Sequence, residues 1–263
     1  ITSTLLIYRR NEEQSKWYLS TRLGTLETGA NEILDLSVSY DGTLFSLVAT
    51  GNNPATSGAF VGIYVLANNT ISQLGRVEQF SFSNSTTVLL SGDGTRLFIT
   101  ERNEFFGGGE EFFRVVRINR VTGQLSSTQV FYRTPGSSLL VNYNGTLLAT
   151  VSPEPPVYVD ELSDVRGIHP IFSFRGRNLK RMALSKDGDY IVFVTERRDD
   201  SRMVAAVYAH EGHKFVKFRD FSLHANSDQE LLGLEIGNNR DIYVSTSTSI
   251  WKYSVKPCIT DER

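Results

Sequence analysis

The sequence lacks several features that would assign it to common protein classes. Its 263 residues contain one cysteine, Cys258, so no internal disulfide can form, and no Cys/His set has the spacing of a structural zinc site. Lys and Arg number 27 against 29 Asp and Glu, so the net charge of −2 offers no basic footprint for nucleic acid or an anionic membrane. The longest apolar run, near residues 60–67, is far too short to span a bilayer. What remains is the composition of an ordinary soluble globular chain.

The motifs of common enzyme classes are also missing. The sequence contains no P-loop, no dinucleotide-binding fingerprint and no G-x-S-x-G nucleophile elbow, so we expect no cofactor and no enzymatic activity. The pair His210 and His213 has metal-ligand spacing for a helix face. However, Gly212 between them favours a turn of a β-hairpin, in which residues three apart do not share a face. We therefore expect no metal site there.

One pattern recurs along the chain: an alternating apolar run, a tight Asx-Gly turn and a second apolar run. It reads LDLSVSYDGTLFSLVAT from Leu34, VLLSGDGTRLFITE from Val88, LLVNYNGTLLATVS from Leu139, MALSKDGDYIVFVTE from Met182 and, in degenerate form, LGLEIGNNRDIYVSTS from Leu232. The turns begin at Asp41, Asp93, Asn144, Asp187 and Asn238, with spacings of 52, 51, 43 and 51 residues. Period-2 alternation around Asx-Gly predicts a β-hairpin. A repeat of about 40–50 residues with four short strands is typical of a propeller blade.

The repeats predict an all-β chain that forms a single β-propeller domain over residues 1–263. We label the four strands of each blade A to D, with the Asx-Gly turn between A and B. The predicted parts are N-terminal closing strands (1–30), blades at 31–80, 81–134, 135–176 and 177–224, a last partial blade (225–256) and a tail (257–263). The strands total about 21, one more than five four-stranded blades need. Either the strand from Lys16 closes a five-bladed ring, which we favour slightly, or the chain is an incomplete larger ring.

These repeats resemble the broad WD40/YVTN-type β-propeller superfamily over nearly the whole chain. The resemblance rests on the strand–Asx-Gly–strand signature, and the Gly-His and Trp-Asp dipeptides of WD40 repeats are absent. A similarity to their C strand is confined to the run IWKY from Ile250. The resemblance implies the fold and no particular activity, because propellers serve as scaffolds, lectins, lactonases and oxidoreductases.

The loops between strands B and C are longer and more varied than the A–B turns, so their face is the candidate functional surface. The most unusual is NEFFGGGEEFF, from Asn103, which places aromatic rings around three glycines with a rim of carboxylates. Such a loop could anchor a protein partner, because buried aromatic residues carry much of the energy of an interface. Alternatively, Phe112 and Phe113 simply open the next strand. The candidate partner-binding residues are Phe105, Phe106, Glu104, Glu110, Arg197 and Arg198.

Two blades share a second feature at the ends of their B strands. The runs LFITERN and VFVTERR place Glu101 and Glu196 at matching positions two blades apart, each followed by an arginine. Carboxylates facing a central channel could bind a cation or act as acid and base. The favoured interpretation is that each forms a solvated ion pair, which contributes little to stability.

The sequence therefore predicts a non-enzymatic propeller that binds a protein partner or assembles with itself. One alternative is an extracellular propeller that binds a glycan or a receptor; a second is a lactonase-like hydrolase that uses the two matched glutamates. Glycosylation sequons stand at Asn68, Asn84 and Asn144, about as many as chance supplies, so they do not establish secretion. The chain begins at Ile1 without a signal segment, which indicates an upstream segment that was removed or an excised domain, and leaves the compartment open.

Overall fold

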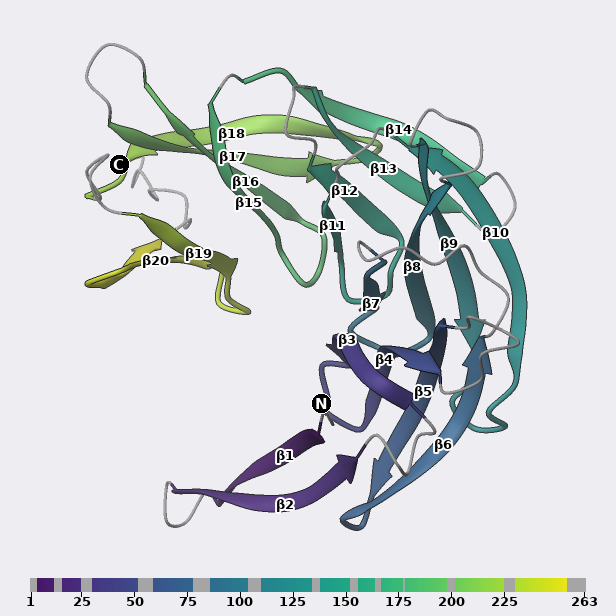
Figure 1. The fold of residues 1–263 in the computed structure, drawn as a ribbon. Helices are drawn as coiled ribbons and strands as arrows, with labels where there is room; N and C mark the ends of the chain where they lie inside the picture. Colours follow the sequence, from purple (N-terminus) through teal and green to yellow (C-terminus); the bar gives the residue numbers. More distant parts are fainter. Residues whose placement is uncertain are drawn as a thin grey trace. The chain divides into compact units, whose positions relative to one another are not determined.

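The computed structural model (Figure 1) shows a chain built from β-strands. It describes residues 4–11, 16–24, 30–51, 59–77, 86–103, 110–133, 138–151, 156–163, 167–176, 178–197, 202–224 and 230–254. These residues form twenty-one strands, paired in antiparallel sheets, within two compact units, residues 1–136 and 137–263. In the described part of the chain no helix has the length and apolar character needed to cross a membrane.

The first unit contains a two-stranded sheet and two four-stranded sheets, which we call blade 1 and blade 2. The two-stranded sheet pairs β1 (Thr4–Asn11) with β2 (Lys16–Gly24). Blade 1 consists of β3 (Ala30–Val38), β4 (Leu44–Gly51), β5 (Ala59–Ala67) and β6 (Thr70–Val77). Blade 2 consists of β7 (Val88–Leu90), β8 (Arg96–Asn103), β9 (Glu110–Ile118) and β10 (Leu125–Arg133). In both blades the strands lie side by side in chain order.

The second unit repeats this arrangement in blade 3, blade 4 and a three-stranded last sheet. Blade 3 consists of β11 (Ser138–Val141), β12 (Leu147–Val151), β13 (Val157–Ser163) and β14 (Gly167–Phe174). Blade 4 consists of β15 (Leu179–Leu184), β16 (Tyr190–Glu196), β17 (Met203–Glu211) and β18 (Lys214–Ser222). The last sheet consists of β19 (Leu231–Ile236), β20 (Asp241–Thr246) and β21 (Ile250–Ser254).

The predicted all-β fold of four-stranded antiparallel blades is confirmed by these sheets. Phe112 and Phe113 lie buried in β9, which agrees with the interpretation that they belong to a strand. His210 and His213 lie at the end of β17 and in the turn that follows it, as the glycine between them predicted. Closure of a five-bladed ring by the N-terminal strands stays a prediction.

The Asx-Gly turns form because glycine adopts the left-handed backbone conformation at little cost. The glycines of the four regular turns, Gly42, Gly94, Gly145 and Gly188, have φ between +66° and +83°. In the degenerate fifth turn Arg240 takes this conformation, with φ of +65°. The loss of glycine in that repeat therefore changed the residue without changing the turn.

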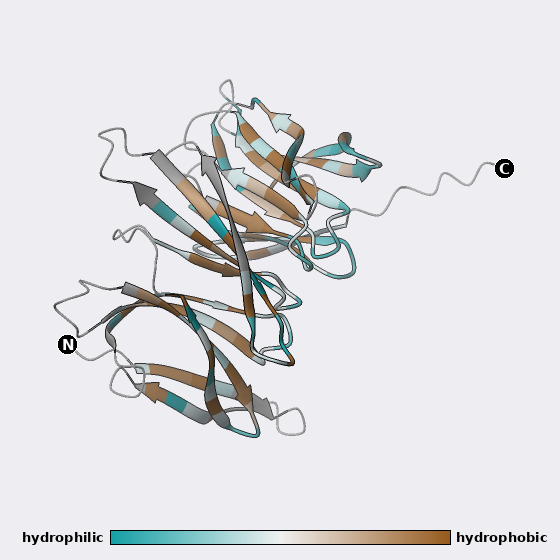
Figure 2. Ribbon diagram, turned by 90° about the vertical axis from the view of Figure 1, so that its right-hand side faces the viewer, coloured by the Kyte–Doolittle hydropathy of each residue, from teal (hydrophilic) through white to brown (hydrophobic). Residues whose placement is uncertain are grey.

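Each unit has its own core, built from alternate residues of neighbouring blades (Figure 2). Along the strands, hydrophobic bands alternate with hydrophilic ones, because successive side chains point to opposite faces of a sheet. Between blades 1 and 2, Leu44 and Val48 pack with Leu97 and Ile99. Between blades 3 and 4 the core is aromatic: the rings of Phe174 and Phe193 stack at 4.2 Å.

Candidate functional site

The two matched glutamates are each held by a cation from the same blade. Glu101, at 1% exposure, accepts a hydrogen bond from Nε of Arg114 at 2.7 Å and a second from its Nη2 at 3.4 Å. The favoured sequence interpretation was a solvated pair, but this pair is buried, and the arginine comes from β9. Glu196 lies 2.7 Å from the ammonium of Lys180 on β15, with both side chains partly exposed.

This arrangement bears on what the glutamates can do chemically. The guanidinium of Arg114 binds Glu101 through two of its nitrogens, so the charge of this buried carboxylate is compensated within its own blade. Within the described ranges, no group of three or more His, Cys, Asp or Glu side chains could hold a metal ion. Both carboxylates are thus paired with a cation of their own blade.

The predicted partner-binding loop lies mostly outside the described residues. Phe105, Phe106, Glu104 and Arg198 all lie there, and Glu110 is the first residue of β9. Arg197 is exposed directly after β16, and its backbone N–H donates to the carbonyl of Arg202 at 2.9 Å. The B–C loop of blade 4 is therefore closed at its base.

The sequons differ in how their asparagines are placed. Asn68 lies in the exposed β5–β6 turn, in the left-handed conformation with φ of +49°. Asn144 lies in the A–B turn of blade 3, where its carbonyl oxygen accepts hydrogen bonds from the Thr146 hydroxyl at 2.6 Å and the Thr146 amide at 3.2 Å. Asn84 lies outside the described residues. The side chain of Asn144 is thus engaged in its own turn.

The A–B turns carry a repeated hydrogen-bond network that sequence analysis did not predict. In blade 1, Oδ1 of Asp41 accepts hydrogen bonds from the Ser39 hydroxyl at 2.7 Å and from the Thr43 amide at 3.0 Å. Arg120, in the β9–β10 turn of blade 2, donates to Oδ2 of Asp41 at 2.7 Å and to the carbonyl of Asp93 at 2.8 Å. This arginine therefore joins the turns of two neighbouring blades.

Hydrogen bonding changes the acidity of two of these turn aspartates. Burial acts to raise the pKa of Asp41, but the hydrogen bonds from Ser39, Thr43 and Arg120 together hold this pKa well below its ordinary value. For Asp187 in blade 4, burial also opposes, while the Ser185 hydroxyl, the Asp189 amide and the charge of Arg240 lower the pKa. Both carboxylates are consequently charged at neutral pH.

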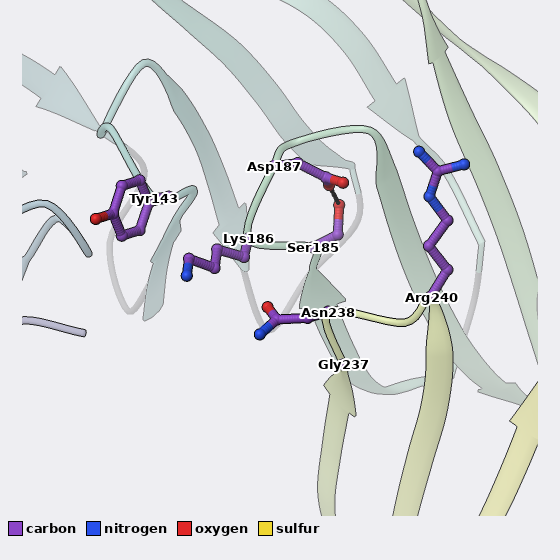
Figure 3. Close-up of a pocket in the computed structure, with 7 residues that line it drawn as sticks. All are labelled: Tyr143, Ser185, Lys186, Asp187, Gly237, Asn238 and Arg240. Carbon is purple, nitrogen blue, oxygen red and sulfur yellow. Dashed lines mark hydrogen bonds between the residues drawn. The ribbon is translucent and has the colours of Figure 1, made fainter. Parts of the chain in front are cut away.

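A pocket of about 220 Å³ opens among the turns of the second unit (Figure 3). The ammonium of Lys186 lies 4.5 Å from the centre of the Tyr143 ring, a cation–π distance. Figure 3 shows Lys186 and Asn238 pointing to the Tyr143 side of the pocket, and Arg240 to the other side. There the guanidinium of Arg240 lies 3.1 Å from Asp189. Lys186, Asp187 and Arg240, which line the pocket, thus each also contact another group of the fold.

The most distinctive surface is a row of apolar side chains on β3 and the turn that follows it. Leu34, Leu36, Val38 and Tyr40 are exposed by 38%, 37%, 50% and 60%. Among the described residues, the corresponding strands β7, β11 and β15 carry no exposed large apolar side chain, and β19 carries one, Leu232, at 52%. Tyr143, at the position of Tyr40 in blade 3, is exposed by 38%. We call Leu34, Leu36, Val38 and Tyr40 the β3 row.

The two faces of β3 have different surroundings. Its other face carries Asp35 and Ser37, which accept hydrogen bonds from the backbone amides of Val88 and Leu90 of β7, each at 2.8 Å. Sequence analysis identified β3 as an A strand from its alternation. It missed the β3 row because alternation does not say which face a neighbour covers.

Comparison with known proteins identifies the fold. No protein-family model and no curated protein matches the sequence. Among solved structures, a functionally unknown protein from Desulfotomaculum acetoxidans matches with a TM-score of 0.63 and 13% identity, over 96% of this chain and 76% of that one. A protein from Lactobacillus plantarum matches with a TM-score of 0.55 and 13% identity, over 97% and 79%. The β-propeller domain of the Trilobed protease from Pyrococcus furiosus matches with a TM-score of 0.55 and 10% identity, over 97% and 80%. At these identities the likeness shows the fold alone, and the chain has a β-propeller fold.

Proposed function

We propose that this chain is a non-enzymatic β-propeller of the WD40/YVTN type that binds another protein. The observation that carries the proposal is the β3 row. Contiguous exposed apolar side chains are uncommon on monomeric proteins and mark interaction surfaces. Leu6, Tyr8 and Leu19 of the two-stranded sheet are also exposed, at 47%, 52% and 49%, on the face of that sheet opposite to Leu5 and Ile7.

The state of the ionisable groups supports binding over catalysis. A general acid or base works best when its pKa lies near the working pH. In the described part of the chain, hydrogen bonds and charges lower the pKa of Asp41, Asp187 and Asp220, and they raise the pKa of Lys217 and Lys252. Each of these shifts moves the pKa of the group further from pH 7. Together with the ion pairs of Glu101 and Glu196, this weighs against a lactonase-like hydrolase.

The aromatic loop supplies a second contact in this proposal. Phe105 and Phe106 bind the same partner, and Glu104 and Glu110 stand on either side of them in the sequence. Arg197 and Arg198 are proposed as partner-binding residues of the second unit. Aromatic anchors surrounded by polar residues are typical of protein interfaces.

The test is capture of a partner by the tagged full chain from its source cells, followed by crosslinking and quantification of the retained proteins. Two double variants are compared with wild type: Leu36→Ser with Val38→Ser, and Phe105→Ser with Phe106→Ser. Val121→Ser is the matched control, because Val121 is 95% exposed on the β9–β10 turn, outside the proposed surface. We expect each double variant to retain at least tenfold less partner, with an unchanged melting temperature.

Two results would overturn the proposal. Equal retention by all variants would place any partner elsewhere. Hydrolysis of lactone or ester substrates by wild type, lost in the Glu101→Gln, Glu196→Gln double variant, would make the chain an enzyme. Unfolding of the Phe105, Phe106 variant would remove only the loop contact, because those rings would then belong to the core.

A further inference from the structure

The two-stranded β1–β2 sheet packs on one face of blade 1 and covers only part of it. Leu5 and Ile7 of β1 and Leu23 of β2 join a cluster with core residues of β4 and β5, including Phe45 and Leu47. The outer strand β2 contacts β6. Figure 1 accordingly shows β1 on the side of β2 that faces β3. The pair thus occupies the position of strands C and D of a blade.

Leu36 and Val38 of the β3 row belong to this same face of blade 1. Val38 pairs with Phe45 and Leu36 with Leu47 across the β3–β4 ladder, and cross-strand partners point to the same face of a sheet. Phe45 and Leu47 are buried at 3% and 0% exposure, whereas Leu36 and Val38 are exposed at 37% and 50%. The covered surface therefore continues directly into the uncovered β3 row.

On the opposite face of blade 1, the A strand β3 is covered by the A strand of the next blade. There β7, the A strand of blade 2, contacts β3 and β4, and the rest of blade 2 follows outward. Neighbouring strands of a sheet lie about 4.8 Å apart, so two strands added beside β1 would extend the β1–β2 sheet by about 10 Å toward β3. Blade 1 likewise has two strands, β3 and β4, before its own C strand β5, so a two-strand extension of the β1–β2 sheet matches the part of blade 1 that this sheet leaves uncovered.

We propose that the β3 row and the edge of β1 form a docking site for a β-hairpin of the A–B type. The hairpin consists of two antiparallel strands with alternating apolar residues and is supplied by the protein partner. One strand hydrogen-bonds to the edge of β1, and the other lays its apolar side chains on Leu34, Leu36 and Val38. This inference rests on the proposed function and names the kind of partner segment that it requires.

The edge of β1 is suited to strand addition. Natural proteins protect exposed edges with lysine, proline or a bulge in the edge strand. β1 carries no lysine and no proline, and its two charged residues, Arg9 and Arg10, lie near its end, after the uncharged run from Thr4 to Tyr8. The irregularity in the β1–β2 ladder places its extra residue, Ser20, on β2 and leaves β1 regular. Backbone hydrogen bonds at such an edge supply affinity, while alternate side chains supply specificity.

The probe is a cyclised peptide of residues 86–101, the chain's own A–B hairpin from blade 2, labelled with a fluorophore. Binding to the full chain is measured by fluorescence anisotropy, and hydrogen exchange is measured over β1. Leu36→Asp with Val38→Asp is the test variant and Val121→Asp the control. The control ligand is the same peptide with Leu89→Ser and Phe98→Ser. These two residues share one face of the hairpin, the face that is turned toward the β3 row when the peptide is docked.

We expect wild type and the Val121→Asp variant to bind the peptide and to exchange the outer amides of β1 at least tenfold more slowly when bound. The Leu36, Val38 variant and the control peptide should each bind at least tenfold more weakly. Absence of binding to wild type, or binding without protection of β1, would overturn the docking site. A concentration-dependent doubling of the mass of wild type, abolished in the Leu36, Val38 variant, would also overturn it and assign the surface to a second copy. If the hairpin fails while the partner assay still depends on Leu36 and Val38, the proposed function stands and only the hairpin is wrong.

Discussion

Two ion pairs whose glutamates follow the same sequence pattern differ in how deeply they are buried. Glu101 and Glu196 follow the same sequence pattern, yet Glu101 is almost fully buried and its partner Arg114 is 18% exposed. The partner of Glu196, Lys180, is 43% exposed. Removing one member of a buried pair leaves an uncompensated charge out of water, while an exposed pair contributes little.

We therefore expect Glu101→Gln to lower the free energy of unfolding by about 3 kcal/mol. Glu196→Gln should lower it by less than about 1 kcal/mol. Urea denaturation of both variants checks this difference. Equal losses would mean that the buried and exposed pairs contribute alike, contrary to their burial.

The turn aspartates predict how stability depends on pH. The pKa values of Asp41 and Asp187 are lowered from 3.8 in the folded protein. Near pH 3.8 the folded state therefore binds fewer protons than the unfolded state. The stabilising contribution of these aspartates is complete above the unfolded value and is lost as the pH falls through the folded one. In blade 3 the equivalent turn position is Asn144, so asparagine is a natural replacement. Replacing both Asp41 and Asp187 with Asn should flatten the fall in stability between about pH 4 and pH 2. Urea midpoints across this range check the prediction, and an unchanged slope would contradict it.

Among the elements, the A–B turn combines a backbone requirement with packing against the neighbouring blade. Gly42 and Gly188 both have positive φ, at +68° and +83°. A Cβ on Gly42 would meet nothing within 4 Å. A Cβ on Gly188 would lie 2.6 Å from Cδ1 of Leu147, in the core of blade 3.

Gly42→Ala should therefore cost about 1 kcal/mol, from the left-handed backbone alone. Gly188→Ala should cost about 1–3 kcal/mol more, because it also overpacks the contact between blades 3 and 4. Thermal and urea unfolding of the two variants measure the difference. Equal costs would show that Leu147 moves aside freely.

For the whole molecule, occupation of the β3 row should appear as added stability. A ligand that binds only the folded state stabilises it by mass action, by about 2.7 kcal/mol at a free concentration of 100 times Kd. We expect the cyclised hairpin of residues 86–101 to raise the melting temperature of the full chain and to leave that of the Leu36→Asp, Val38→Asp variant unchanged. A similar rise in both would indicate binding at another surface.

Much of the architecture could be predicted from the residues because the repeat is local. The alternation around Asp41, Asp93, Asn144 and Asp187 specifies two strands and the turn between them within about fifteen residues, and the hairpins formed there. The degenerate turn at Asn238 was also identified from the alternation around it. It forms without glycine because Arg240 adopts the left-handed conformation there.

The candidate site was less predictable because it depends on which faces meet. Nothing near Glu101 in the sequence indicates that Arg114, thirteen residues away on the next strand, binds it in a buried pair. Likewise, Leu36 and Leu44 are both apolar residues of blade 1, yet Leu36 is exposed and Leu44 is fully buried. Period-2 alternation defines two faces of a strand, and only packing between sheets decides which face is covered.

The strands, their turns and their grouping into blades follow from local sequence, because backbone propensity and hydrophobic alternation act between near neighbours. That β1 and β2 cover part of one face of blade 1 and leave the β3 row exposed follows instead from the packing of sheets that are distant in the chain. The same holds for Arg120, which joins the turns of Asp41 and Asp93 although it lies 79 residues after Asp41 in the sequence. These contacts depend on surfaces brought together from distant parts of the chain, and their energies are set by burial and geometry that no local pattern records.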